Sequence, residues 1–275
     1  MKTYGAIIKQ IRKGKSISQI ELSNTILSRT TISKIENNNI VPTINTLEAI
    51  LHKLDVTVDE FQFIRNGYKL NPRESIIADF FKLVSNTQTE KVNSIIYRCN
   101  IHLTHKPTDI LISDVRIILK ASLHLSNNET LVAQKLVTPV WERLKKMDHF
   151  SLIELRLVTN ILFYFPVDIV QEFFPRLVNT INKYISFDNT IITLKLALLI
   201  NTATLFLLNN PKSTLENLEE AIKIAKEINR FDFLAYAYYL KGINTNNPSL
   251  VAKAGAIFIA IEKEDILHQL ESNFK

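Results

Sequence analysis

The chain has 275 residues, 46% of them hydrophobic, but only five glycines and one cysteine. Hairpins, bulges and phosphate-binding loops depend on glycine, so this composition predicts an all-α protein and disfavours nucleotide-binding enzymes, while a lone cysteine excludes an intramolecular disulfide framework. The net charge of +6 is concentrated at one end, because residues 1–40 hold seven basic and two acidic residues, or 7 − 2 = +5. Such clustering is expected of a phosphate-binding surface, although a solvated basic face would look the same.

Five short segments at the N-terminal end carry hydrophobic residues at helical spacing. The first segment, 4–13, places Ile7, Ile8 and Ile11 on one face, and Gly14 is expected to end it in the left-handed conformation. Hydroxyl side chains, which cap helices well, precede the other four segments, and a glutamate follows the first of them at capping-box spacing. We therefore predict helices that begin after Ser18, Ser28, Thr43 and Thr57 and end near Asn24, Glu36, Leu54 and Ile64.

These helices are expected to share one small core. Their apolar stripes predict the following buried residues: Ile20 and Leu22 in the second helix, Ile32 and Ile35 in the third, and Ile44, Leu47, Ile50, Leu51 and Leu54 in the fourth.

The length of the helical segments increases after Asn66-Gly67. We interpret this position as a domain boundary between residues 1–66 and 67–275. Longer helical segments of about 15–20 residues follow, separated by short polar breaks. About ten such helices in antiparallel pairs predict an α-solenoid of about five helix pairs, although no tetratricopeptide consensus repeat is present. The breaks are expected near residues 86–89, 105–108, 126–129, 147–151, 165–168, 187–189, 209–212, 229–231 and 244–248.

We expect a cytoplasmic protein that does not cross a membrane. The N-terminus is charged and polar, unlike a secretion signal, and the most apolar stretch, 191–208, is interrupted by Lys195 and Asn201.

Residues 17–65 combine two short helices, a tight turn, a glutamine at the start of the first helix and a serine cap on the second. In this pattern the segment resembles the lambda-repressor-like (Cro/C1, or XRE) helix-turn-helix family, which implies that its second helix reads the major groove of DNA. The resemblance implies that Gln19 contacts a phosphate and braces the recognition helix, and that Arg12 and Glu36 form an internal salt bridge. The expected DNA contacts are Gln19, Ser28, Arg29, Thr30, Thr31, Ser33, Lys34 and Asn38.

The turn lacks the usual glycine of that family and is one residue shorter, with Ile26-Leu27 in its place. The pattern from Leu27 to Glu36, together with Asp59-Glu60-Phe61 and a long helical remainder, resembles the Rgg/GadR/MutR regulators of Gram-positive bacteria. That resemblance implies a tetratricopeptide-like C-terminal domain that dimerises. In several members it also binds a short hydrophobic signalling peptide in a concave groove, as in quorum sensing.

Residues 152–165 are apolar nearly all round, yet Arg156, Asn160 and Tyr164 recur at every fourth position. A cation among apolar neighbours suits a site that receives a peptide carboxylate, but an internal salt bridge is equally compatible. Asn201 lies among leucines and can bond either a peptide backbone or a neighbouring helix. We predict peptide contacts at Arg156, Asn160, Tyr164 and Asn201.

The sequence predicts a homodimeric transcription regulator that binds an inverted-repeat operator in double-stranded DNA. Cys99, His102 and His105 do not converge on a helix, and no catalytic arrangement is present, so we expect no metal site, cofactor or enzyme activity. Two alternatives remain: a regulator whose helical domain binds another protein instead of a small ligand, and an enzyme with a DNA-targeting domain.

Overall fold

The computed structural model describes residues 2–23, 27–83, 89–187, 190–207 and 209–274. Within these ranges the regular elements are sixteen α-helices and one 3-10 turn, which confirms the predicted all-α class. The chain divides into two compact units, Met1–Asp79 and Phe80–Lys275. This division falls inside α6 (Pro72–Lys82), downstream of the domain boundary expected after residue 66.

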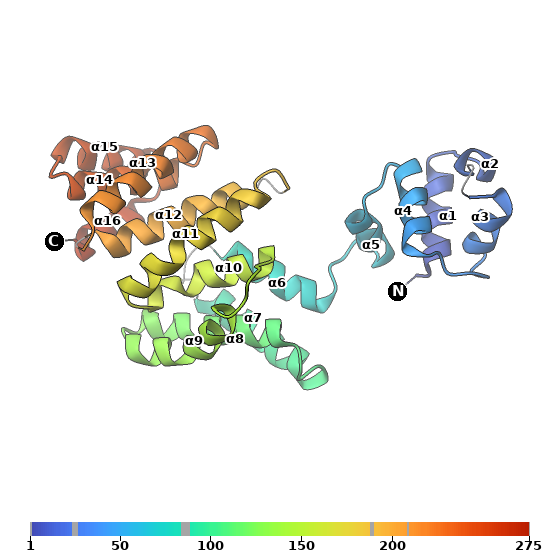
Figure 1. The fold of residues 1–275 in the computed structure, drawn as a ribbon, viewed down its shortest axis with the longest axis horizontal. Coiled ribbons are helices and arrows are strands. Elements are labelled where there is room, and N and C mark those ends of the chain that lie inside the picture. The colour runs from blue at the N-terminus through green and yellow to red at the C-terminus, as the bar shows by residue number, and fades with distance from the viewer. Residues whose placement is uncertain (1, 24–26, 84–88, 188–189, 208, 275) are drawn as a thin grey trace. The chain divides into compact units, whose positions relative to one another are not determined.

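The first unit contains five short helices, drawn in blue in Figure 1. The hydroxyl side chains of Ser18, Ser28, Thr43 and Thr57 each accept a backbone N–H three residues on, and Ser18 also forms the expected capping box with Glu21. The caps were therefore predicted correctly from sequence. The helices are α1 (Tyr4–Gly14), α2 (Gln19–Leu22), α3 (Arg29–Glu36), α4 (Ile44–Lys53) and α5 (Val58–Arg65).

Three details of the first unit differ from expectation. Gly14 is the last residue of α1, and the left-handed residue that turns the chain is Ser16, with φ of 58°. Ile20 is 65% exposed, because α2 has only four residues and Leu22 takes its core-facing position. Ile44 is 72% exposed, because it is the first residue of α4 and the apolar stripe turns to the core only from Leu47 onward.

The core of this unit gathers one or more residues from every helix and from the turn before α3. Its largest fully buried side chain is Phe61 of α5. Gly5 of α1 packs directly against α3, since a Cβ atom there would lie 1.9 Å from the Ile35 carbonyl oxygen. The buried residues are Ile7, Ile8, Leu22, Leu27, Ile32, Ile35, Leu47, Ile50, Leu51, Leu54, Phe61 and Ile64.

The second unit is a series of helices in which successive helices pack together from α7 to α9 and from α11 to α16 (Figure 1). Their bounds are α7 (Thr89–His105), α8 (Ile110–Ser126), α9 (Thr130–Leu144), α10 (Leu152–Ile161), η1 (Leu162–Tyr164), α11 (Val167–Tyr184), α12 (Thr190–Phe206), α13 (Pro211–Glu227), α14 (Phe231–Asn244), α15 (Pro248–Ala260) and α16 (Glu264–Asn273).

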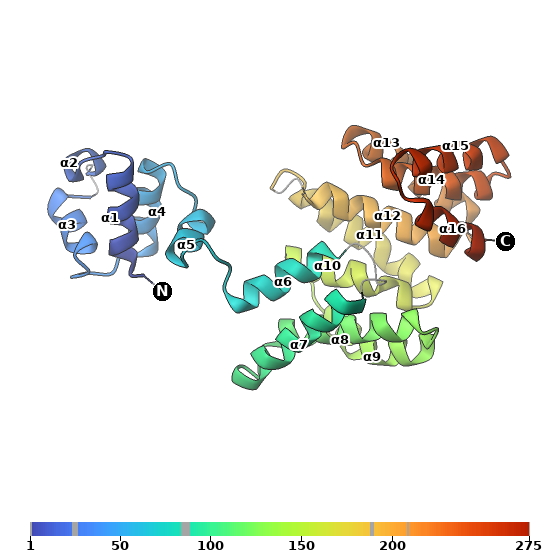
Figure 2. The same cartoon turned by 180° about the vertical axis from the view of Figure 1, so that it is seen from behind.

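Alternate helices of this unit also contact one another: α8 packs on α10, α10 on α12, and α12 on α14. Figure 2 shows the same succession of helices from behind. A curved stack of helix pairs brings the helices of its inner layer closest together, so we infer that α8, α10, α12 and α14 form the inner layer. The solenoid of helix pairs expected from sequence is thereby confirmed.

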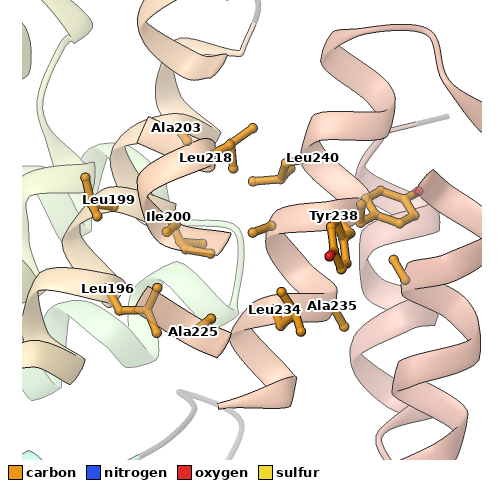
Figure 3. Packing of buried hydrophobic residues seen from close by; sticks show 14 of the residues in the cluster. Leu196, Leu199, Ile200, Ala203, Leu218, Ala225, Leu234, Ala235, Tyr238 and Leu240 are labelled. Carbon is orange, nitrogen blue, oxygen red and sulfur yellow. The ribbon is translucent and has the colours of Figure 1, made fainter. Parts of the chain in front are cut away.

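The largest core of the second unit lies between α12 and α16. Figure 3 shows Leu196, Leu199 and Ile200 of α12 facing residues of α13 and α14. Both α12 and α14 bury residues on most of their circumference. This is expected of helices whose apolar residues are not confined to one stripe. None of the helices in the described ranges has the length and apolarity needed to cross a membrane.

Candidate nucleic-acid interface and regulatory face

Helix α3 presents a polar face and buries an apolar one. Ser28 accepts the Thr31 N–H at 3.1 Å and fixes the start of the helix, while Ile32 and Ile35 are buried in the core. The opposite face exposes Arg29, Thr30 and Lys34, and Thr31 and Ser33 are half-buried beside it. This arrangement exposes two cations and the Thr30 hydroxyl to a DNA groove, whereas the hydroxyls of Thr31 and Ser33 are hydrogen-bonded to Ser28 and Asn37.

A buried ion pair fixes α3 against α1. The Arg12 Nε donates to Glu36 Oε1 at 2.5 Å and its Nη2 to Oε2 at 2.9 Å, while Nη1 donates to the Ile17 carbonyl oxygen at 2.6 Å. The predicted salt bridge is therefore confirmed. Burial alone would raise the pKa of Glu36, but hydrogen bonds from Arg12 and Gln19 hold that pKa below its ordinary value.

Gln19 joins the same network. Its Nε2 donates to Glu36 Oε2 at 2.8 Å, which ties the first residue of α2 to the last residue of α3. This bond gives the expected bracing of the recognition helix a direct geometric basis. The contact between Gln19 and a DNA phosphate stays a prediction.

The end of α2 is held by a residue that sequence reasoning missed. The Lys53 Nζ, at the end of α4, donates to the carbonyl oxygens of Glu21 at 3.2 Å and Ser23 at 2.5 Å. These carbonyls belong to the last turn of α2, where backbone acceptors have no partner within the helix. Lys53 thus caps α2 from a distance. A lysine in the last turn of an amphipathic helix gives no sequence signal for this role.

We expect Lys53→Met to weaken DNA binding by about tenfold, because the end of α2 would lose its anchor while the aliphatic stem is kept. Lys53→Arg is expected to restore most of the affinity, because a guanidinium can also donate to both carbonyls. Fluorescence anisotropy with a labelled operator measures both variants. Unchanged affinity in Lys53→Met would contradict the positioning role.

The remaining expected DNA contact, Asn38, follows α3. It is exposed and adopts a left-handed conformation with φ of 59°. In the turn between α2 and α3, Ile26 lies outside the described residues, and Leu27 is buried in the core.

In the second unit, Arg156 of α10 is half-buried and already engaged. Its Nη2 donates to Thr190 Oγ1 at 2.7 Å, and its guanidinium lies 4.8 Å from the centre of the Phe81 ring. Asn160, one turn further along α10, is exposed, and its Nδ2 donates to the Arg156 carbonyl oxygen at 2.8 Å. The structure therefore brings Arg156 and Asn160 together on one side of α10.

The other two expected peptide contacts differ in accessibility. Asn201 of α12 is exposed, in agreement with a surface role. Tyr164 of η1 is buried, and its hydroxyl has no hydrogen-bond partner within the part of the chain that the structure describes. Because burial removes the phenolate from water, the pKa of Tyr164 is raised. Tyr164 is therefore not an exposed side chain, unlike Asn160 and Asn201.

Sequence reasoning also missed two ion pairs between neighbouring helices. Lys195 of α12, which only interrupted an apolar run in the sequence, is buried and pairs with Glu220 of α13 at 2.5 Å. Asp114 of α8 pairs with Arg143 of α9, yet burial raises the pKa of its carboxyl. Both pairs are compatible with structural roles in joining successive helices.

No cluster of three or more His, Cys, Asp or Glu side chains suited to a metal ion occurs among the described residues. His102 lies 2.9 Å from Asp109, and Cys99 is fully buried. Burial raises the pKa of the Cys99 thiol to about 11, so the neutral thiol is the form expected in this core.

The sequence profile of the helix-turn-helix family matches residues 8–61, which include α2 and α3. The ImmF control region 10 kDa protein of Bacillus phage phi105 is 40% identical over 72 residues, which are 24% of this chain and 80% of the phage protein. The chain belongs to the helix-turn-helix family. Its N-terminal unit is accordingly a DNA-binding domain, and α2 and α3 lie within the matched segment.

Solved structures of full-length regulators share the fold over the whole chain. A protein of Listeria monocytogenes EGD-e assigned as a transcriptional regulator matches with a TM-score of 0.74 and 21% identity, covering 99% of both chains. The pheromone receptor Rgg2 of Streptococcus dysgalactiae matches with a TM-score of 0.66 and 16% identity, covering 98% of both. PlcR of Bacillus thuringiensis, solved with the peptide PapR7 and DNA, gives 0.67 and 14%, covering 98% of this chain and 99% of PlcR. The Rgg-like architecture expected from sequence is thus confirmed at the level of the fold.

Proposed function

We propose that this helix-turn-helix regulator binds a specific operator and is controlled by a short hydrophobic peptide at its helical C-terminal unit. The proposal rests on two features together. Helix α3 exposes a polar face, and the inner helices of the solenoid expose polar side chains. The same fold occurs in PlcR, which was solved with a peptide and DNA.

In the DNA-binding unit, we assign base contacts and phosphate contacts to different polar residues. Arg29 reads a base, because its exposed guanidinium at the start of α3 can bond a guanine through two hydrogen bonds. Thr30, Thr31, Ser33 and Lys34 line the same helix face and contact bases or phosphates. Gln19, Ser28 and Asn38 contact the phosphate backbone, which positions the helix without specifying sequence.

If Arg29 reads a guanine, Arg29→Ala should cost about 1–3 kcal/mol at one operator position and relax the preference there. The measurement is the affinity for a set of operators that differ at single positions, at fixed salt concentration. Lys34→Ala serves as the comparison: if Lys34 contacts a phosphate, its loss weakens all operators alike. Equal weakening on every operator by Arg29→Ala would remove Arg29 from base recognition.

On the peptide side, Arg156, Asn160 and Asn201 supply a cation and two amides on the inner helices α10 and α12. A peptide carboxylate can bond the guanidinium, and the amides can bond the peptide backbone as donor and acceptor. Tyr164 is buried and stacks on Phe163, so we assign the direct peptide contacts to Arg156, Asn160 and Asn201 and not to Tyr164.

The peptide proposal predicts that Arg156 recognises a C-terminal carboxylate. A fluorescent hydrophobic octapeptide with a free C-terminus should bind at least about tenfold more tightly than the same peptide with an amidated C-terminus. Arg156→Ala should abolish this difference, whereas Lys183→Ala on α11 should preserve it. Thermal unfolding is the control that checks whether the Arg156→Ala variant remains folded. Equal binding of both peptides by the wild type contradicts the role of Arg156.

We further propose that the regulator acts as a homodimer on an inverted-repeat operator, with the solenoid of residues 67–275 joining the two subunits. Sedimentation at micromolar concentration should give about twice the 31.6 kDa of one chain. A peptide that binds two solenoid arrangements unequally would then change operator affinity.

A further inference from the structure

Tyr238 lies in the middle of α14, and its ring belongs to the core between α12 and α16 (Figure 3). The side chain is only 7% exposed. A tyrosine in such a core keeps its ring among apolar neighbours, while its hydroxyl requires polar partners.

Those partners are two lysines from the helices on either side. The Lys253 Nζ, on α15, donates to the Tyr238 hydroxyl at 3.4 Å and lies 4.5 Å from the ring centre. The Lys226 Nζ, on α13, lies 5.9 Å from the ring centre. Both lysine side chains are exposed. Two ammonium groups from different helices therefore meet at one phenol that is almost completely buried.

No carboxylate within the described ranges forms an ion pair with either lysine. Three acidic residues of α13 and α14 are paired with other cations: Glu219 with Lys241, Glu220 with Lys195, and Asp232 with Arg230 and Lys263. Burial alone would raise the pKa of Tyr238, but hydrogen bonds from both lysines lower it. Neither ammonium group of the cluster therefore has a carboxylate within salt-bridge distance among the described residues.

We propose that Tyr238, Lys226 and Lys253 form a binding site for a small oxyanion, either a phosphate or a carboxylate. The phenol oxygen accepts from the lysines, which leaves its O–H to donate to an anion oxygen, and each ammonium has further N–H groups to donate. A charge-assisted hydrogen bond of this kind is about twice as strong as a neutral one. A bound phosphate dianion would balance both positive charges and a carboxylate would balance one of them; either anion would link α13 to α15. This site does not depend on the proposed peptide function.

The test uses the full chain labelled with 3-fluorotyrosine, so that fluorine NMR reports on each tyrosine separately. Tyr238→Phe identifies the resonance of Tyr238. Inorganic phosphate and acetate are then titrated in separate experiments at constant ionic strength. Because only the Tyr238 resonance is followed, phosphate binding at the helix-turn-helix unit does not contribute to the signal.

We expect a saturable shift of the Tyr238 resonance at millimolar anion concentration. In the double variant Lys226→Ala/Lys253→Ala the affinity should fall at least about tenfold, since both charged donors are lost. Lys223→Ala, which removes another exposed lysine of α13, should leave the titration unchanged. A response to phosphate alone assigns the site to phosphoryl groups, and a response to acetate assigns it to carboxylates. No saturable shift with either anion, or the same shift in the double variant, would overturn the proposal.

Discussion

Glu36→Ala is expected to destabilise the helix-turn-helix unit by about 3–5 kcal/mol, the range for removal of one partner from a buried ion pair. The Glu36 side chain is fully buried and that of Arg12 is 9% exposed. Without the carboxylate, Arg12 would keep only its bond to the Ile17 carbonyl oxygen, and Gln19 would lose its acceptor. The substitution thus removes hydrogen bonds that join α1 and α2 to α3. DNA affinity should therefore fall together with the stability of the unit.

Trp141, the single tryptophan, lies in the second unit, so intrinsic fluorescence does not report on this loss. Hydrogen exchange of the amides of residues 4–65 is the appropriate measurement. Glu48→Ala on the exposed side of α4 is the control and should change protection little. In the double variant Arg12→Met/Glu36→Leu, stability should recover in part, because well-packed apolar residues can replace a buried pair. If residues 4–65 of Glu36→Ala kept the hydrogen-exchange protection of the wild type, the pair between Arg12 and Glu36 would not be needed for the stability of the unit.

The same pair predicts a dependence on pH. The pKa of Glu36 is held below its ordinary value of 4.5 in the folded unit. The ionised carboxylate therefore contributes stability that is fully present above about pH 4.5 and is lost as the pH falls through the lowered pKa. Protection of residues 4–65 should decline on acidification in the wild type, and Glu36→Ala should lack this component.

The sequence was most informative where local chemistry decides the structure. A serine or threonine before an apolar periodic segment has few roles other than capping, so four helix starts could be assigned from Ser18, Ser28, Thr43 and Thr57. The ion pair between Arg12 and Glu36 was also foreseen, because the family resemblance relates two positions that are far apart in the chain.

Contacts that depend on the packing of distant segments could not be predicted. Nothing in the pattern around Lys53 indicates that its ammonium reaches two carbonyls of α2. Tyr164 shared a helical stripe with Arg156 and Asn160, but the chain passes from α10 into a 3-10 turn at Leu162. The three residues per turn of that element end the shared stripe and leave Tyr164 buried.

The exposed polar face of α3 was easier to predict than the exposed polar residues of α12, for a related reason. On α3 the polar residues alternate with Ile32 and Ile35, so one short helix defines both its buried and its exposed side. On α12 nearly every residue is apolar, and the inner layer becomes visible only through contacts between alternate helices. The position of Asn201 on an exposed face is a property of the assembled solenoid.

Gly5→Ala is expected to be the most disruptive single-carbon change in the first unit. The added Cβ would lie 1.9 Å from the Ile35 carbonyl oxygen and 2.9 Å from Asn38 Oδ1. Because the first of these atoms belongs to the backbone of α3, no side-chain rotation can relieve the overlap, and α1 and α3 must separate. Overpacking of a core costs about 1–3 kcal/mol and occasionally more, and a clash with backbone belongs at the upper end.

Gly14→Ala provides the matched control, since Gly14 is also in α1 but a Cβ atom added there would have no neighbouring heavy atom within 4 Å. There the substitution should stabilise the unit by at most about 0.5 kcal/mol, because alanine loses less backbone entropy than glycine in a helix but Gly14 is the last residue of α1. Hydrogen exchange of residues 4–65 and operator affinity should therefore move in opposite directions in the two variants. Since Gly5 sets the distance between α1 and the recognition helix, Gly5→Ala should weaken operator binding even at temperatures where the unit stays folded. Equal stability of the two variants would show that α3 shifts freely against α1, and that the buried network around Glu36 does not fix the recognition helix.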